Sequence, residues 1–359
     1  MNFTLEKEIK DKGIVNVGDT NKIFKALSKC EKGEEVTIAF LGGSITQGCH
    51  ARVHETSYGY RTYEWFKERF KDAKIKYINA GVGATGSVIG VHRVEKQVLE
   101  LKPDLIFIDF AVNDRDDYYC KVAYESLIRK ILLWPNAPGI IEVFMSLETL
   151  TNVQEQQIQI GKKYSISMIS YKDVIKDQIE KGRFKWEDIE ADEVHPNDNG
   201  HYIIMQLLTN FLEGVLNKSI VCEKRKSILG NPIFGDKYMK GAIINNTNTN
   251  VIKIEGFTKY EEGFQVFHNG WKCEDNGRLV AEVKGKNIFI LYKKIVDDSA
   301  GKMQIKVDDY TTLELDCLFK DGWGDFSEKT SLVEEEITKN HKIEIQSSGN
   351  VTIMGFLVS

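Results

Sequence analysis

The stretch VTIAFLGGSITQG, residues 36–48, decides the fold of the first half of the chain. Its first six residues are apolar or β-branched, a pattern typical of a strand covered on both faces, as in a parallel sheet. Four similar runs follow at residues 75–79, 104–110, 139–145 and 166–170. Segments with helical periodicity separate these runs. We therefore expect a three-layer α/β/α domain with a parallel sheet over residues 1–216.

The pattern changes over residues 217–235, which we interpret as a linker. From residue 236 to residue 359 helical periodicity disappears, and apolar residues alternate with polar ones, as at Met303, Ile305 and Val307. Gly, Asn and Asp separate these runs at intervals suited to turns. Short alternating strands of this kind predict a carboxy-terminal all-β domain, an antiparallel sandwich or jelly roll.

Composition excludes several classes of function. The 359 residues include 48 Lys and Arg against 53 Asp and Glu, a net charge of −5. Nucleic-acid and anionic-membrane partners need a basic surface, so neither is expected. Residues 1–13 show no apolar signal-peptide core, and no apolar run approaches the roughly 18 residues of a membrane span. The six cysteines, including Cys49 and Cys222, lack metal-site spacing. We expect a cytoplasmic protein with reduced thiols and no bound metal.

Polar residues cluster where the predicted strands end. Ser44 follows the first strand, the Gly83-Ala84 pair follows the second, and Asn113 follows the third. Asp192 and His195 lie just before the last helix of this half. The carboxyl ends of parallel strands meet at one edge of the sheet, so these residues are expected to lie together. A Ser, a His, an Asp and amide donors are the groups that acyl transfer requires.

These residues resemble the four sequence blocks of the SGNH (GDSL-type) hydrolase superfamily, over residues 34–216. FLGGSITQG, NAGVGATGS, AVND and DEVHP occur in the family's order, and the variants look like a subgroup associated with carbohydrate esters. Three positions depart from the usual motifs. Gly43 replaces Asp, Ala111 replaces Gly, and Ala84, or Gly83 under a shift of one residue, stands where a Gly usually donates its N–H.

The resemblance implies a function and a set of site residues. Ser44 is the nucleophile, His195 the base and Asp192 the group that orients His195. The oxyanion hole comprises the N–H groups of Ser44 and Ala84, with Gly83 as the alternative donor, and the side chain of Asn113. The expected activity is hydrolysis of a short acyl ester, acetyl above all, on a carbohydrate, with no cofactor and no metal.

Other functions stay open on the sequence alone. A lysophospholipase- or thioesterase-type hydrolase would use the same residues, and a glycan-binding protein could keep the fold with a silent site. Residues 81–86 form a GxGxxG with Asp109 downstream, which weakly suggests a dinucleotide enzyme. His50 and His54 are interpreted as polar loop residues rather than a metal pair. The β domain, in which Trp271 and Trp323 lie near turns, would also allow a homo-oligomer.

Overall fold

The computed structural model describes residues 3–220, 229–308 and 310–359. The chain divides into two compact units, one of Met1–Gly90 with Val94–Asp236, the other of Val91–Arg93 with Lys237–Ser359. Among the described helices, none combines the length and the apolar character needed to cross a membrane. Five cysteines are described and all are free thiols, while Cys222 lies outside the described residues.

The first unit is built on a mixed sheet whose described strands follow the order β1-β6-β5-β4-β2-β3. Its strands are β1 (Ile14–Asn16), β2 (Glu35–Gly42), β3 (Lys74–Gly81), β4 (Leu105–Asp109), β5 (Gly139–Phe144) and β6 (Ser167–Ser170). β2 to β6 pair in parallel and correspond to the five predicted strands, which confirms the α/β prediction. The sequence reading missed β1, a three-residue strand that pairs antiparallel with β6 at the edge.

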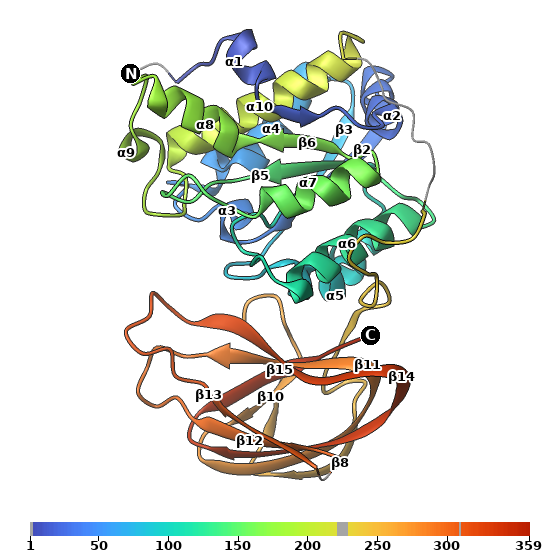
Figure 1. The fold of residues 1–359 in the computed structure, drawn as a ribbon, viewed down its shortest axis with the longest axis vertical. Helices are drawn as coiled ribbons and strands as arrows, with labels where there is room; N and C mark the ends of the chain where they lie inside the picture. Colours follow the sequence, from blue (N-terminus) through green and yellow to red (C-terminus); the bar gives the residue numbers. More distant parts are fainter. Residues whose placement is uncertain (1–2, 221–228, 309) are drawn as a thin grey trace. The chain divides into compact units, whose positions relative to one another are not determined.

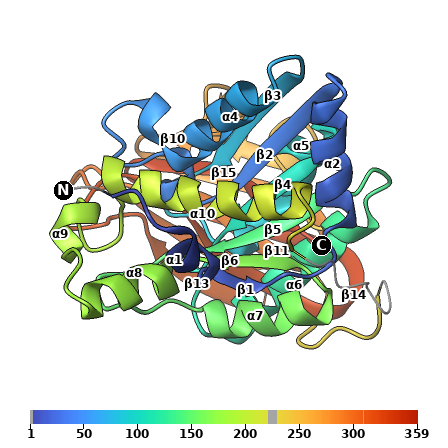
Figure 2. The same ribbon diagram turned by 90° about the horizontal axis from the view of Figure 1, so that it is seen from above.

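Helices cover both faces of this sheet (Figures 1 and 2). They are α1 (Lys7–Asp11), α2 (Asn21–Glu31), α3 (Ser44–Gln47), α4 (Tyr58–Arg69), α5 (Ser87–Gln97), α6 (Tyr118–Leu133), α7 (Gln154–Lys163), α8 (Tyr171–Glu180), α9 (Trp186–Ile189) and α10 (Asp198–Leu216), with 3₁₀ turns η1 (His54–Thr56) and η2 (Leu99–Leu101). Residues of α2, α4 and α10 pack against one face of β2 and β4 in a shared core. α6 and α7 contact each other on the opposite face, where Met168 of β6 is buried.

The junction where β2 runs into α3 is packed so tightly that Gly42 and Gly81 have no room for a side chain. A Cβ at Gly42 would lie 2.2 Å from Thr46 Oγ1, and one at Gly81 would lie 2.1 Å from the backbone N of Gln47. Such distances are far below van der Waals contact, so both positions require glycine. The ends of β2 and β3 can therefore meet the first turn of α3 directly, which fixes the position of Ser44.

A buried carboxyl lies beneath this junction. The Thr46 hydroxyl donates a hydrogen bond of 3.1 Å to Asp109 Oδ2 at the end of β4, and the Tyr58 hydroxyl lies 2.7 Å from Thr46 Oγ1. Asp109 is fully buried, and its Oδ1 has no partner among the described residues. Burial raises the pKa of Asp109 to about 7, opposed by the Thr46 hydrogen bond and assisted by the carboxyl of Asp114. An acid placed so deeply is unsuited to bind a ribose hydroxyl.

The second unit is one continuous antiparallel sheet that folds over on itself. Its strands are β7 (Ala242–Ile244), β8 (Asn250–Glu255), β9 (Thr258–Tyr260), β10 (Gly270–Cys273), β11 (Asn276–Lys294), β12 (Lys302–Val307), β13 (Thr311–Asp316), β14 (Phe326–Ser348) and β15 (Val351–Val358). β11 and β14, with 19 and 23 residues, are much longer than the short strands predicted. They pair along their whole length, with register shifts between Gly285 and Asn287 and between Ile288 and Phe289.

The two ends of β11 have different neighbours. Along the edge of β11 that faces away from β14, the residues before Gly285 pair with β8 and the residues from Ile288 onward pair with β15. The inward residues of both halves share one core, which includes Leu279, Ile290 and the fully buried Trp271. The predicted sandwich is thus confirmed, and Trp271 is a core residue. Trp323, in contrast, is 71% exposed.

The described end of the segment interpreted as a linker is anchored to the first unit. The N–H groups of Ile233, Phe234 and Gly235 donate to the carboxylate of Glu125 in α6, at 2.6 to 3.1 Å. Glu125 is buried and also accepts a hydrogen bond of 2.6 Å from the Tyr164 hydroxyl. Four donors around one buried carboxylate satisfy its charge, so residues 233–235 hold a defined conformation. Residues 221–228 of this segment lie outside the described residues.

We expect Asp109→Asn to make stability less dependent on pH. Between the ordinary aspartate pKa of about 3.9 and the raised value of about 7, the folded chain keeps a proton that the unfolded chain has lost. The wild-type contribution of Asp109 to the free energy of unfolding therefore falls as pH rises through this window. Asn cannot ionise and removes this contribution. Urea unfolding at about pH 5 and pH 7.5 measures the difference.

The matched control is Asp116→Asn, whose carboxylate is 75% exposed and pairs with Lys121 at the surface. It should follow the wild-type dependence on pH. Parallel stability curves for wild type and Asp109→Asn would show that Asp109 is ionised in the folded protein across this range.

Candidate active site

Ser44 is the first residue of α3, immediately after the tight junction that ends β2. N–H groups in the first turn of a helix have no partner within the helix, so the backbone here is free to donate. An ideal Cβ at Gly43 would lie 2.2 Å from Asn113 Oδ1 and 2.8 Å from Asn113 Nδ2. The Asn113 amide thus occupies the space that an aspartate side chain at position 43 would need. Position 43 therefore has no room for a side chain here, and Asn113 lies beside Ser44.

Asp192 and His195 belong to a short loop that is closed at its base. Glu190 and Pro196 form an antiparallel bridge, and the Ala191 N–H donates to the His195 carbonyl at 2.8 Å. The Asn197 side chain then caps the first turn of α10. Burial raises the pKa of Glu190 to about 9, and its carboxyl accepts a 2.5 Å hydrogen bond from Tyr171. A protonated Glu190 adds no second negative charge beside Asp192.

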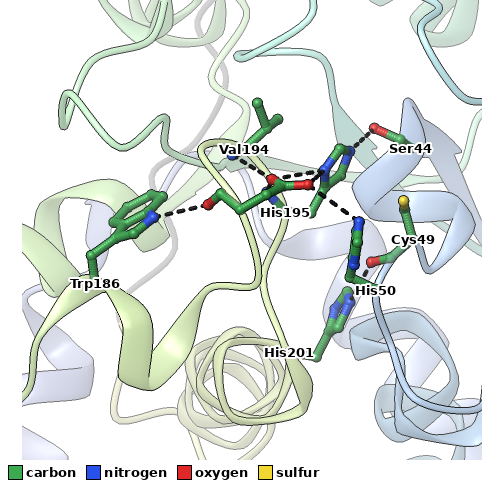
Figure 3. A network of polar contacts seen from close by, with 8 residues as sticks. Ser44, Cys49, His50, Trp186, Val194, His195 and His201 are labelled. Carbon is green, nitrogen blue, oxygen red and sulfur yellow. Dashed lines mark hydrogen bonds and ion pairs between the residues drawn. The ribbon is translucent and has the colours of Figure 1, made fainter. Parts of the chain in front are cut away.

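The three predicted catalytic side chains form a continuous chain of hydrogen bonds (Figure 3). His195 Nδ1 lies 2.7 Å from Asp192 Oδ2, and His195 Nε2 lies 2.9 Å from Ser44 Oγ. An ionised carboxylate only accepts, so Nδ1 carries the proton and Nε2 is left to accept from the serine hydroxyl. This is the tautomer that a serine nucleophile requires of its base.

Backbone donors keep Asp192 ionised. Burial pushes the pKa of Asp192 up, but the hydrogen bond from His195 and those from the N–H groups of Val194 and His195 outweigh it, and the pKa falls below its ordinary value. Both N–H groups donate to Oδ1, at 2.7 and 2.8 Å. The Trp186 indole N–H donates to the Asp192 carbonyl at 2.9 Å and holds the backbone of the loop. The orienting carboxylate is therefore fixed on both sides.

The loop after β3 distinguishes between the two candidate oxyanion donors. The Gly83 N–H donates to Gln47 Oε1 at 2.8 Å, so it is engaged within the protein. Ala84 adopts the left-handed φ of 59°, and no acceptor within the described part of the chain bonds its N–H. This geometry favours Ala84 over Gly83. The cost of a positive φ at a residue with a Cβ is of the order of 1 kcal/mol, a strain typical of functional sites.

Asp114 ties this loop to the strand that carries Asn113. Its Oδ1 accepts a 2.7 Å hydrogen bond from the Ser87 N–H at the start of α5, and a Cβ at Gly86 would lie only 2.5 Å from the same oxygen. Asp114 is 6% exposed. The loop of Ala84 and the turn of Asn113 therefore hold a fixed spacing. The sequence analysis gave Asp114 no role, because its contact with Ser87 joins segments distant in the chain.

Three further residues around the site were not predicted from sequence. Gln47 contacts Gly83, and both Trp186 and His50 contact Asp192. The contacts of Gln47 and His50 join segments far apart in the chain, whereas Trp186 lies six residues before Asp192, and no local motif marks any of the three. His50 Nε2 lies 3.2 Å from Asp192 Oδ2, whereas the His54 ring packs against Tyr60, so the two histidines do not form a pair. Among the described residues, the group able to hold a metal ion is Cys49, His50 and His195.

Known proteins share sequence and fold with this chain. The model of the GDSL-like Lipase/Acylhydrolase family matches residues 40–203. No curated protein sequence matches the chain. Two solved structures of a two-domain esterase (CEX) active on acetylated mannans share 30% sequence identity with it. One has a TM-score of 0.92 and covers 98% of both chains.

The other solved structure, co-crystallized with mannopentaose, has a TM-score of 0.89 and covers 98% of this chain and 97% of that one. The likeness therefore extends over both units, and the family segment contains Ser44 and the Asp192–His195 loop. The chain belongs to the GDSL-like lipase/acylhydrolase family and is a carboxylic ester hydrolase.

Proposed function

We propose that the protein removes acetyl groups from an acetylated carbohydrate, with acetylated mannan as the leading substrate, by a Ser44-His195-Asp192 mechanism. The observation that carries the mechanism is the hydrogen-bonded chain from Ser44 Oγ through His195 to Asp192, at 2.9 and 2.7 Å. The observation that supports the substrate is the likeness over nearly the whole chain to an esterase active on acetylated mannans.

The first half of the reaction transfers the acetyl group to the enzyme. Ser44 Oγ attacks the ester carbonyl carbon as His195 Nε2 takes the hydroxyl proton, and the carbonyl π electrons move to the oxygen. Collapse of this tetrahedral intermediate breaks the bond to the sugar oxygen. That oxygen leaves with the proton from His195 as a free sugar hydroxyl, and acetyl-Ser44 remains.

The second half repeats these steps with water. His195 takes a proton from a water molecule, whose oxygen attacks the acetyl carbonyl, and the second intermediate releases acetate and restores the Ser44 hydroxyl. In both intermediates the N–H groups of Ser44 and Ala84 and the amide of Asn113 donate to the negative oxygen. Donors of this kind, fixed before the reaction starts, are typically worth about 10²–10³ in rate each.

The substrate proposal is tested by two sets of initial rates. Acetate release is measured on acetylated mannan and on acetylated xylan, and nitrophenyl esters of increasing acyl length are compared under the same conditions. We expect the acetyl ester to be the best nitrophenyl substrate and the mannan to exceed the xylan in kcat/KM. Rates that rise with acyl length would favour a lysophospholipase- or thioesterase-type hydrolase instead.

Ser44→Ala should abolish most of the turnover while the fold is kept. The substitution removes the nucleophile and adds no atoms, and we expect kcat on a nitrophenyl acetate to fall by about 10⁴ or more. Circular dichroism checks the fold. His54→Ala, at a nearby histidine outside the hydrogen-bonded chain, should keep wild-type activity. A Ser44→Ala enzyme that retains a tenth of the wild-type rate would exclude Ser44 as nucleophile.

Asn113→Ala tests the oxyanion hole separately from the nucleophile. The amide donor gains most of its strength as charge develops on the ester oxygen, so the loss should fall on kcat, by about 10²–10³, with KM little changed. Steady-state kinetics on the acetyl ester separate the two constants. A raised KM at unchanged kcat would make Asn113 a residue that binds the ground state.

A further inference from the structure

A cysteine and a second histidine lie beside the base of the proposed mechanism. The thiol of Cys49 and one nitrogen from each of His50 and His195 lie within 4.8 Å of one another. Figure 3 shows the three side chains together next to Ser44. The centroids of the two imidazole rings are 5.3 Å apart. The acyl-transfer steps proposed above use neither the Cys49 thiol nor the His50 ring.

The local backbone brings these side chains together. Gly48 follows the last residue of α3 and turns the chain back with a φ of 101°, and His50 adopts a left-handed φ of 60°. A left-handed backbone is uncommon at a residue with a Cβ and costs free energy unless contacts compensate for it. Here the His50 ring reaches Asp192, 3.2 Å from its carboxylate. The conformation directs His50 toward the catalytic loop rather than away from it.

The three donors match the coordination chemistry of zinc. Zn²⁺ prefers Cys sulfur and His nitrogen in a tetrahedral arrangement, with bonds of about 2.3 and 2.0 Å. Such bonds place ligand atoms about 3.3 to 3.7 Å apart, so donors already within 4.8 Å need only small side-chain movements. His50 is exposed, and Cys49 and His195 are partly exposed, so an ion can enter from solvent. The carboxylate of Asp192 adds a negative charge beside the site.

We propose that Cys49, His50 and His195 form a binding site for Zn²⁺, and that the bound ion inhibits the esterase by engaging His195 as a ligand. Zn²⁺ replaces the proton of the Cys49 thiol, which is released to solvent, and takes a lone pair from each imidazole. On His195 this lone pair is that of Nε2, because Nδ1 carries the proton that faces Asp192. A His195 Nε2 bound to zinc cannot accept the Ser44 proton. The inhibition rests on the proposed function, because it requires His195 to be the catalytic base, whereas the binding does not.

Binding is tested with Co²⁺, a spectroscopic substitute for zinc, on the full-length protein. A thiolate bound to Co²⁺ gives a charge-transfer band in the near ultraviolet that histidine or carboxylate ligands do not give. We expect the band with the wild type and with Ser44→Ala, its loss on addition of Zn²⁺, and its absence from Cys49→Ala. His54→Ala, at a histidine outside the cluster, should show the wild-type spectrum. No band with the wild type, or an equal band with Cys49→Ala, would overturn the site.

Inhibition is tested by esterase assays at increasing Zn²⁺, with a chelator to show reversal. Cys49→Ala should keep its basal rate and need at least about tenfold more zinc for half inhibition, since even supporting groups of metal sites contribute about 10- to 100-fold to affinity. Cys49→Ser, which keeps a polar side chain, should behave alike. Equal zinc sensitivity in wild type and Cys49→Ala would overturn the proposal.

The two proposals fail in different ways. Full activity of Ser44→Ala would overturn the Ser44 mechanism, yet the Co²⁺ band would still report the metal site. A band that Zn²⁺ displaces without any loss of activity would retain the site and overturn the inhibition, while the Ser44 mechanism would still be judged by the rate of Ser44→Ala.

Discussion

The close packing around three glycines at the ends of β2 and β3 is the constraint on which the rest of the site depends. At Gly42, Gly43 and Gly81 a Cβ would lie within about 2.2 Å of a neighbouring atom. Without these side chains the first turn of α3 rests on the ends of β2 and β3, and Asn113 fits against Gly43. Because packed interiors do not yield to an added methyl group without strain, the position of Ser44 is set by the sheet itself rather than by a flexible loop.

Three carboxyls near this junction differ in charge, because they differ in burial and in the number of hydrogen bonds that they accept. Asp192 receives hydrogen bonds from the His195 ring and two backbone N–H groups, and its pKa is lowered. Asp109 and Glu190 receive one side-chain hydrogen bond each in deeply buried positions, and burial raises the pKa of both. The site thus holds one ionised carboxylate beside His195, while its neighbours are protonated up to about neutral pH. This arrangement keeps His195 in a single tautomer.

The second unit shows how long strands produce a two-layer structure. β11 and β14 remain paired across a register shift at Gly285, so the sheet bends there and each half acquires its own partner strand. A bulge of this type increases local twist and redirects the strands beyond it. The inward residues of both halves then meet in one apolar core around Trp271. The alternation at Met303, Ile305 and Val307 reflects that core directly, since all three are buried.

The sequence by itself determined the five parallel strands, the all-β character of the second half, and the residues Ser44, Asn113, Asp192 and His195. These features rest on local patterns, namely apolar runs, period-two alternation and motifs of a few residues, and local patterns are readable without a fold. Only the tertiary structure distinguished the N–H of Ala84 from that of Gly83, because Gln47, at the end of α3, accepts a hydrogen bond from Gly83. It also decided the edge strand β1, the contact of Gly43 with Asn113, and the meeting of Cys49, His50 and His195. Each of these is a contact between segments distant in the chain, whose partners are chosen by packing and not by neighbouring residues.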